Sequence, residues 1–391
     1  MTSRNILIIG AGIGGLTTAL AFARNGHEVD IVEQAPTLSE VGAGLQVSPN
    51  ASRILSALGL GDAFLKAMIR PHEIVLASGR SLRKITHVPC GMFAENRWGA
   101  PYGVMHRADL QSLLRDAVVA HPGCHLHLDQ RIASDDIGSW HERFGRPRPD
   151  LVVGADGVWS QTRRLIKDAP APRFSGQVAW RFKVPTELTR SALNPTNVTA
   201  FLGSRTHLVA YPLEQGKAVN IVAITRGSDP GETWAERENP KGRADLLNAF
   251  AGWHPDLITI LRQAPEMTFW PLFEVPDGSW HNSDRTILIG DAAHAMTPFA
   301  AQGAAMAIED GYELAQACNQ ASGDMTSTLD RYETLRRARI GRTRNRGAFN
   351  QFAYHASGPI RVGRDLVLSL KSPESLAGDL DWLYGYRATG L

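Results

Sequence analysis

A glycine-rich segment near the N-terminus constrains the fold of this chain more than any other feature. The apolar run Asn5–Ile9 (NILII) fits a strand buried on both faces of a parallel sheet. GAGIGG follows at residues 10–15, then a helix-forming stretch at residues 16–25 that ends at Gly26, and a second strand-like run, Glu28–Val32. The pattern G-x-G-x-x-G between a strand and a helix predicts a dinucleotide-binding β-α-β unit. Its glycines are Gly10, Gly12, Gly14 and Gly15.

This spacing has a mechanical meaning. Glycines permit the tight turn and let the backbone approach a pyrophosphate at the helix N-terminus. Glu33, directly after the second strand, is the acid expected to bind ribose hydroxyls, and Gln34 beside it is a further cofactor-binding candidate. Glu33 also disfavours a ribose phosphate, because two negative charges would meet. A glycine-rich turn in an ordinary α/β protein is the alternative, and the motif alone does not distinguish NAD from FAD.

Two later segments each place a carboxylate at the end of a strand. Residues 150–157 read DLVVGADG, ending at Asp156-Gly157, and residues 285–291 read RTILIGD, ending at Gly290-Asp291. The carboxyl ends of strands are where α/β sheets bind ligands, and an aspartate there can accept hydrogen bonds from a sugar-alcohol chain. Asp291 is also a candidate N-cap for a helix that starts at Ala292, and one residue can serve both purposes.

Composition limits the classes of protein that remain. A chain of 391 residues with 43% hydrophobic residues and a net charge of +2 predicts one large domain or two joined domains. Three widely separated cysteines suggest neither a disulfide framework nor a zinc cluster, so a cytoplasmic protein is expected. No stretch is long and apolar enough to cross a membrane. A late arginine cluster favours a solvated or docking helix face over nucleic acid; it comprises Arg336, Arg337, Arg339, Arg342, Arg344 and Arg346.

The three motifs, in this order, resemble the single-component FAD-dependent aromatic hydroxylases, also called class A flavoprotein monooxygenases. Three further stretches resemble their salicylate hydroxylase and hydroxybenzoate hydroxylase branch, which also includes hydroxynicotinate hydroxylases. These stretches are GAGLQVSPNASRIL at residues 42–55, HRADL at 106–110 and PFAAQGAAMAIED at 298–310. The resemblance covers nearly the whole chain.

The expected architecture is α/β: a Rossmann-type FAD-binding domain interrupted by a smaller, sheet-containing substrate domain, with C-terminal helices. Residues 1–75, 101–172 and 271–391 are assigned to the FAD-binding domain, and residues 76–100 and 173–270 to the substrate domain. Four β-like runs in the second domain support this division, at residues 177–184, 198–202, 207–211 and 218–225. The arginine-rich helix, expected at about residues 325–346, should pack along the FAD-binding domain or a neighbouring subunit.

The resemblance implies a monooxygenase in which NADH or NADPH reduces FAD, and O₂ then forms a flavin hydroperoxide that hydroxylates a small aromatic acid. The chain lacks a second G-x-G-x-x-G, so NAD(P)H has no nucleotide domain of its own, unlike in the disulfide reductases. The alternatives are a flavin oxidase or dehydrogenase of small molecules and a nucleotide-binding protein without turnover. A homodimer is an expected assembly, with no nucleic-acid or membrane partner.

The resemblance also assigns roles to cofactor-binding residues. Glu33 would hold the adenosine ribose, and Arg107 would meet the phosphate or ribityl region. Asp291 would bind the ribityl chain, and Asp156 would shape the flavin and NAD(P)H region. Small residues at Gly303 and Ala304 would let backbone N–H groups approach the pyrimidine edge of the flavin, where such groups stabilise negative charge.

The catalytic candidates lie in HLVAYP, at residues 207–212. In a strand, His207 and Tyr211 point to the same face, with Val209 between them. Histidine and tyrosine suit a base or relay that converts a substrate phenol to the more reactive phenolate. An ordinary sheet histidine and a core tyrosine before a turn at Pro212 are the alternative.

Two further residues belong to the predicted catalytic site through the resemblance, Gln46 and Pro298. The hydroxynicotinate branch carries a histidine where this chain has Gln46, which favours a hydroxybenzoate substrate.

Overall fold

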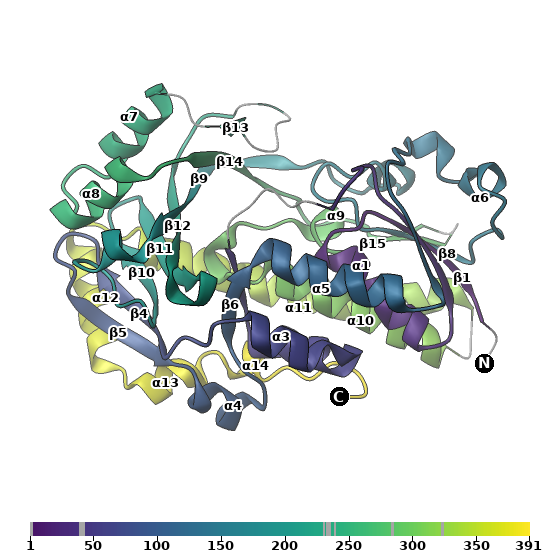
Figure 1. Cartoon of the computed structure of the whole chain (residues 1–391), viewed down its shortest axis with the longest axis horizontal. Helices are drawn as coiled ribbons and strands as arrows, with labels where there is room; N and C mark the ends of the chain where they lie inside the picture. The colour runs from purple at the N-terminus through teal and green to yellow at the C-terminus, as the bar shows by residue number, and fades with distance from the viewer. Residues whose placement is uncertain are drawn as a thin grey trace.

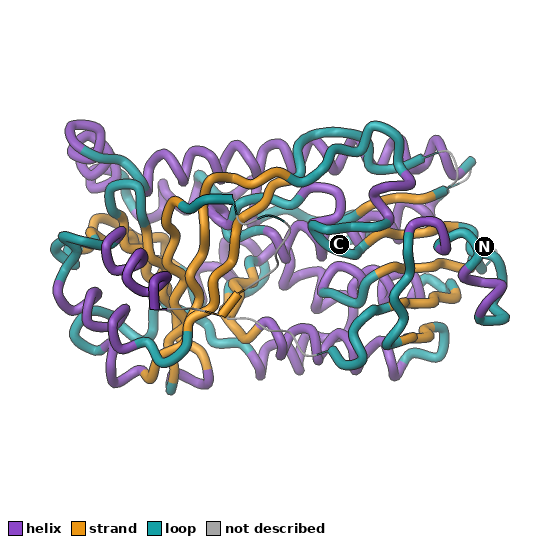
Figure 2. Tube along the Cα trace, turned by 90° about the horizontal axis from the view of Figure 1, so that it is seen from above, coloured by secondary structure: helices purple, strands orange, loops and turns teal. Residues whose placement is uncertain are grey.

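The computed structural model describes residues 3–38, 44–229, 231, 236–237, 240–282, 285–321 and 324–391. Gly42 and Ala43, which open one of the stretches quoted above, lie outside these residues. Two groups of strands occupy opposite ends of the long axis of the molecule, and helices fill the space between and around them (Figures 1 and 2).

The first group is a five-stranded sheet in which every pairing is parallel. Its order is β15 (Thr286–Leu288), β8 (Leu151–Gly154), β1 (Asn5–Ile9), β2 (Glu28–Val32) and β7 (Cys124–His127). Ile6 and Ile8 face one hydrophobic cluster, while Leu7 and Ile9 face another that includes Trp140. Burial on both faces explains why β1 is apolar from Ile6 to Ile9, and the predicted bounds of β1 and β2 are confirmed.

Helices α1 (Ile13–Arg24), α5 (Arg107–Ala120) and α10 (Gly303–Gln320) pack together, with α1 contacting both of the others. The long helix α11 (Met325–Tyr354) runs along α10. The predicted arginine-rich helix is therefore confirmed, but it continues eight residues past Arg346. Arg336 and Arg339 are buried within it, so part of its cluster belongs to the interior rather than to a solvated face.

The second group is an eight-stranded sheet in which only the pairing of β10 with β4 is parallel. Its order is β13 (Glu236–Arg237), β14 (Met267–Glu274), β9 (Arg173–Pro185), β12 (Ala218–Arg226), β11 (His207–Leu213), β10 (Val198–Leu202), β4 (Glu73–Ser78) and β5 (Lys84–Pro89). All four predicted β-like runs lie in these strands.

The turn considered at Pro212 is wrong, because β11 continues to Leu213. Pairing with β10 stops at Ala210, while pairing with β12 continues past Pro212. A residue without an N–H is tolerated where one side of the strand has no partner.

The two faces of the eight-stranded sheet differ in what covers them. Trp180 and Phe182 on one face pack against α7 (Pro240–Ala249) and α8 (Pro255–Gln263). On the other face, Ala179, Ile224 and Leu272 pack against Phe299, which precedes α10. The second face therefore packs against the segment that leads into α10.

The remaining elements connect or cover these sheets. A two-stranded sheet consists of β3 (Gly44–Val47) and β6 (Gly103–His106). The other α-helices are α2 (Pro49–Leu55), α3 (Gly61–Ala67), α4 (Met92–Trp98), α6 (Trp140–Arg143), α9 (Asp291–His294), α12 (Gly358–Leu370), α13 (Pro373–Gly378) and α14 (Asp381–Tyr384). The π- and 3₁₀-helical turns are η1 (Ser56–Leu60), η2 (Ser134–Asp136), η3 (Thr162–Leu165), η4 (Thr186–Thr189), η5 (Glu214–Gly216) and η6 (Pro298–Ala300). Within the described ranges, no helix combines the length and the apolar character needed to cross a bilayer.

Candidate active site

The glycine-rich loop is shaped by close backbone contacts. A Cβ at Gly10, where φ is +103°, would lie 2.5 Å from the carbonyl oxygen of Ala155, and a Cβ at Gly15 would lie 2.0 Å from that of Gly10. These two glycines are therefore required by packing. Gly12, the N-cap of α1, has no protein atom within 4 Å of such a Cβ, and no acidic side chain lies in the first turn of the helix. The N-terminus of α1 is thus open to an anion.

Glu33 holds this loop in place. One carboxylate oxygen accepts a hydrogen bond from the Ala11 N–H (2.8 Å) and the other accepts one from the Ala35 N–H (2.9 Å). Gln34 is exposed beside it. The buried Gln111 on α5 donates to the Ala11 carbonyl at 3.1 Å, a contact that sequence reasoning missed. Glu33 therefore lies at the loop, where an acid in this motif is expected.

Arg107 is the first residue of α5, and it is half-buried. Its neighbour His106 occupies the N-cap. The helix carries Gln111 one turn further on, and Gln111 reaches the glycine-rich loop. Arg107 therefore lies on the same helix as Gln111, which contacts the glycine-rich loop.

Asp156 differs from the expectation that its carboxylate is available to a ligand. Both of its oxygens accept hydrogen bonds from its own turn: the Ser160 hydroxyl (2.5 Å), the Gln161 N–H (2.8 Å) and the N–H and hydroxyl of Thr162 (3.0 Å each). The side chain caps the turn that leads into η3. Asp156 shapes the edge of the sheet through this turn.

The turn at Gly290 and Asp291 leaves the Asp291 side chain exposed. Gly290 is the N-cap of α9 with φ +56°, and a Cβ there would lie 3.1 Å from that of Ala307. Asp291 is the first helical residue and makes no side-chain cap hydrogen bond, so the N-cap interpretation of Asp291 is wrong. Glycine takes the cap position because its positive φ is one that other residues rarely adopt. The buried Arg163 donates to the carbonyls of Asp291 and Ala292 and fixes the turn.

The alanine-rich stretch begins a helix with an open N-terminus. Pro298 opens η6, and Ala301 follows with φ +52°, a left-handed conformation uncommon for alanine. Gln302, 2% exposed, is the N-cap of α10 and is held by Ser48 (3.0 Å). A Cβ at Gly303 would meet no protein atom within 4 Å. Ala304 beside it is half-buried, and the first N–H groups of α10 have no acceptor within the helix itself.

A buried network of charged side chains joins the last two turns, and sequence reasoning missed it. Asp310 is fully buried and accepts from the Gly290 N–H (2.9 Å) and Arg336 Nε (2.7 Å), and it lies 2.5 Å from His294 Nε2. Burial alone would raise the pKa of Asp310, but His294 and Arg336 hold this pKa at about 2. The carboxylate therefore stays ionised and anchors the Gly290 turn.

The adjacent Glu309 extends the network to the other turn. It accepts from Arg336 (2.8 Å), from Arg339 (2.7 Å) and from Asn50 (2.7 Å). Asn50 in turn donates to Gln302 (3.3 Å). A signal for this network exists in the sequence: two adjacent acids follow an apolar run in α10, and two arginines three residues apart lie further along the chain.

His207 and Tyr211 lie on the sheet face that looks toward these turns, but they meet different partners. The His207 ring lies 5.0 Å from that of Phe299, next to Pro298, and its Nδ1 lies 2.9 Å from His355 Nε2. Tyr211 packs against Gly44, where a Cβ would lie 2.6 Å from its ring. Burial raises the pKa of Tyr211, and burial together with His355 holds that of His207 well below its usual value. Both side chains are therefore neutral near pH 7.

Gln46 lies on β3, in the same small sheet as Gly44, and accepts a hydrogen bond from the Tyr102 hydroxyl. Its amide oxygen is thus engaged, which leaves the amide NH₂ as the group available to a ligand.

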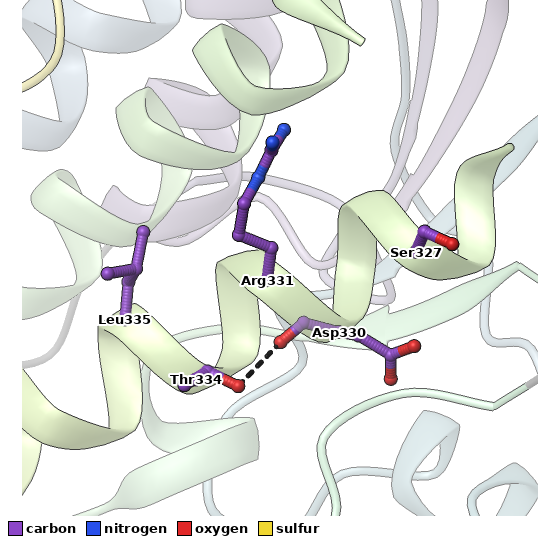
Figure 3. Close-up of a pocket in the computed structure, with 5 residues that line it drawn as sticks. All are labelled: Ser327, Asp330, Arg331, Thr334 and Leu335. Carbon is purple, nitrogen blue, oxygen red and sulfur yellow. Dashed lines mark hydrogen bonds between the residues drawn. The ribbon is translucent and has the colours of Figure 1, made fainter. Parts of the chain in front are cut away.

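A separate hollow of about 440 Å³ lies on the outer face of α11 (Figure 3). Its lining residues all come from this single helix, where the Thr334 hydroxyl donates to the Asp330 carbonyl at 2.8 Å. None of them is a predicted site residue; they are Ser327, Asp330, Arg331, Thr334 and Leu335. The candidate site is therefore the region around the motifs and not this hollow.

The described residues fit FAD and offer nothing for a metal ion. Gly12 at the N-terminus of α1 and Gly303 at the N-terminus of α10 each have open space where a side chain would point. Asp291, which lies between these two glycines in the sequence, has an exposed side chain. Within the described part of the chain, no group of three histidine, cysteine or acidic side chains is placed to bind a metal. Helix N-termini suit phosphates and a reduced flavin, and the carboxylate suits sugar hydroxyls.

Comparison with known proteins agrees with this geometry. The family described as "FAD binding domain" matches residues 3–346. The chain is 32% identical over 392 residues to 3-hydroxybenzoate 6-hydroxylase of Klebsiella oxytoca, covering 97% of this chain and 96% of that protein. It is 31% identical over 411 residues to salicylate hydroxylase of Pseudomonas putida, covering 97% and 91%.

A solved structure shows the same fold. Klebsiella pneumoniae HpxO, complexed with FAD and uric acid, superposes with a TM-score of 0.78 at 22% identity, covering 97% of this chain and 96% of that one. The match with the relatives above extends over both sheets and the helices between them. The chain therefore belongs to the FAD-dependent aromatic hydroxylases, the flavoprotein monooxygenases that include 3-hydroxybenzoate 6-hydroxylase and salicylate hydroxylase.

Proposed function

We propose that this chain uses NADH or NADPH and O₂ to hydroxylate the ring of a small aromatic acid of the salicylate or hydroxybenzoate type. The observation that carries the proposal is the contact between His207 and Phe299. This contact places His207, the candidate base, beside the segment that leads into the N-terminus of α10. A substrate ring beside this pair would meet both the cofactor and a proton acceptor.

Bound FAD supplies the activation of oxygen, and the residues of the chain bind, orient and shield. The glycine-rich loop and Glu33 would hold the adenosine part and the pyrophosphate, with Gln34 and Arg107 at the rim. Asp291, presented by Gly290, would bind the ribityl hydroxyls. Gly303 and Ala304 would place their N–H groups at the flavin, and the turn of Asp156 would form the adjoining wall.

His207 and Tyr211 would manage the proton of the substrate hydroxyl. A neutral imidazole in an apolar setting accepts a proton from a phenol in the transition state, and a phenolate ring is attacked faster by an electrophile. Gln46 would orient the substrate through its amide NH₂, and Pro298 would fix the turn opposite. These roles favour a hydroxybenzoate over a hydroxynicotinate.

The domain division proposed is residues 1–75, 101–172 and 271–391 for FAD and residues 76–100 and 173–270 for substrate. The five-stranded and eight-stranded sheets support it. The second sheet extends slightly past two of these bounds, because β4 begins at Glu73 and β14 ends at Glu274.

A homodimer is proposed as the assembly. Large apolar side chains are 55–77% exposed along α12 and the end of α11; they are Phe349, Phe352, Ile360, Val362, Leu366, Val367 and Leu370, which we call the α11–α12 apolar surface. Exposed patches of this kind mark interaction sites. We propose a cytoplasmic location, because Cys90, Cys124 and Cys318 are free thiols and NAD(P)H is a metabolite of that compartment.

The test starts with the absorbance spectrum of the purified protein, which should show bound flavin. NADH and NADPH consumption is then measured with a panel of hydroxybenzoates and pyridine carboxylates. A hydroxylase shows substrate-stimulated oxidation, with one atom of labelled O₂ in the product. Oxidation of an amine or alcohol without oxygen incorporation would indicate an oxidase or dehydrogenase, and a protein that takes up no FAD would indicate a nucleotide-binding protein.

The catalytic assignment is tested with His207→Ala and Tyr211→Phe. Both variants should retain FAD and NADH-driven flavin reduction. Product yield should fall, with hydrogen peroxide released instead, and the loss should ease at high pH where the free substrate ionises by itself. Wild-type coupling at every pH in both variants would remove these residues from the mechanism.

A further inference from the structure

Two histidines in contact connect the interior of the eight-stranded sheet with the C-terminal end of α11. His207 is only 3% exposed on β11, whereas His355, the C-cap of α11, is half-buried. Nδ1 of the first ring lies 2.9 Å from Nε2 of the second. The backbone N–H of Arg205 donates to the His355 carbonyl at 3.3 Å and ties the end of α11 to the strand. The pair is therefore a fixed hydrogen bond between a buried and a partly exposed imidazole.

The surroundings of the pair disfavour a charged ring. Phe299 lies 5.0 Å from His207 and 5.4 Å from His355, and Tyr354 lies 5.4 Å from His207 (ring centroids). Burial lowers the pKa of His355 to about 4, with a further contribution from Arg226. The pKa of His207 is also lowered by burial and by His355. Both rings are neutral near pH 7, so one donates and the other accepts.

We propose that His355 is the outer half of a proton relay that carries the substrate hydroxyl proton from His207 to solvent. This inference rests on the function proposed above. His207 Nε2 makes no hydrogen bond within the described part of the chain, so it is the nitrogen available to substrate. His355 Nδ1 is the nitrogen remaining on the outer ring, where the side chain reaches the surface.

The transfer balances without creating a buried cation. The substrate O–H bond breaks and its proton binds His207 Nε2. The proton on His207 Nδ1 moves to His355 Nε2, and the proton on His355 Nδ1 leaves to water. Each ring stays neutral and exchanges one tautomer for the other. The relay resets when the hydroxyl of the departing product takes a proton back along the same route.

The test measures proton release when 3-hydroxybenzoate or salicylate is mixed with the FAD-loaded, oxidised protein, using a pH indicator and the phenolate absorbance. His355→Gln keeps a hydrogen-bonding partner for His207 but lacks a second ring nitrogen. Release should slow by about tenfold or more in this variant. His355→Ala should slow equally and recover with added imidazole. His125→Gln, a change at a surface histidine of β7, should release the proton at the wild-type rate.

The outcomes separate the relay from the function on which it rests. Slow release in His207→Ala with wild-type release in both His355 variants overturns the relay alone. Wild-type release in His207→Ala overturns the proposed role of His207 and the relay with it. Slow release in the His355 variants without rescue by imidazole shows that His355 only supports the structure, and this also overturns the relay. FAD affinity and thermal stability, measured in parallel, should be unchanged in His355→Gln.

Discussion

Asp291 illustrates how a single residue separates cofactor binding from stability. Its side chain is exposed and makes no cap hydrogen bond, so Asp291→Ala should leave the free energy of unfolding of the apoprotein within about 0.5 kcal/mol. Loss of charge-assisted hydrogen bonds to the ribityl chain should weaken FAD binding about 10- to 100-fold. Flavin fluorescence titration and denaturant unfolding measure the two quantities separately.

Asp324→Ala is the matched control. Asp324 caps α11 by accepting a hydrogen bond from the Ser327 N–H at 3.0 Å. Its removal should lower the stability of the apoprotein measurably and leave FAD affinity unchanged. If Asp291→Ala instead destabilises the apoprotein as much as Asp324→Ala, the carboxylate is structural and the assigned role is wrong.

The histidine pair predicts an acid-sensitive fold. Because the pKa of each histidine is lower in the folded protein than the ordinary 6.5, protonation favours the unfolded chain. The stabilisation that the two neutral histidines provide is fully present above pH about 6.5 and is lost as the pH falls toward about 4. Between pH about 6.5 and about 4, the free energy of unfolding should therefore decrease by about 1–2 kcal/mol less in His355→Gln than in the wild-type protein. An unchanged pH dependence would contradict the assigned burial.

Residues whose role is local were predictable from sequence, and residues whose role depends on distant partners were not. Gly10 and Gly15 follow from the turn that the motif requires. Asp156 was expected to offer its carboxylate, but no pattern in the sequence shows that the next turn would occupy both oxygens. His355 lies 148 residues from His207, and only the fold brings the two rings together.

At the scale of elements, the open N-terminus of α10 predicts a steric effect on the cofactor. A Cβ at Gly303 meets no protein atom, so Gly303→Leu should leave the stability of the apoprotein unchanged or slightly raised. The same side chain would occupy the space assigned to the flavin, and FAD affinity should fall at least about tenfold, or about 1.4 kcal/mol. Gly341→Leu on α11, also with open space at its Cβ, should leave FAD affinity unchanged. Equal FAD binding in both variants would move the flavin away from this helix.

Helix α11 allows a comparison between two adjacent arginines. Arg336→Met removes the partner of the fully buried Asp310 and Glu309 and should cost about 3–5 kcal/mol of stability. Arg337→Met breaks an exposed pair with Asp277 and a longer pair with Glu333 on its own helix, and should cost less than about 1 kcal/mol. Denaturant unfolding of both variants checks this difference, and similar losses would mean that the buried network contributes little.

Elements with a regular local pattern were predicted closely, including β1, β2 and four strands of the second sheet, β9, β10, β11 and β12. The end of α11 was not, because Gly347, directly after the arginine cluster, disfavours a continuing helix. The continuation through Pro212 depends on where β10 stops pairing. Both features are set by neighbours in space rather than by adjacent residues.

At the scale of the whole molecule, the α11–α12 apolar surface predicts self-association. Leu366→Asp should raise the dimer dissociation constant at least about 30-fold, because a buried apolar contact at an interface contributes about 2 kcal/mol or more. Val119→Asp on α5, where the exposed valine lies outside the defined surface, is the control. Light scattering coupled to size exclusion measures both. A monomeric wild-type protein, or a Leu366→Asp dimer of unchanged affinity, would contradict the proposed assembly.

The overall arrangement of motifs was predictable because the three cofactor segments occur in a recognisable order. The buried network that joins them was not, since its hydrogen-bonded partners lie up to 259 residues apart and most carry charges that a sequence normally places on the surface. Charge pairing in the interior is a property of the assembled fold.

This network also orders events during synthesis. Asn50 and the glycine-rich loop leave the ribosome long before Glu309, and Glu309 leaves before Arg336 and Arg339. Until those arginines emerge, α10 would bury Glu309 without a counter-charge and Asp310 with His294 as its only partner of that kind, which is strongly unfavourable. We therefore expect α10 to settle against the first β-α-β unit late, and the chain to acquire its flavin only after nearly all of it has been translated.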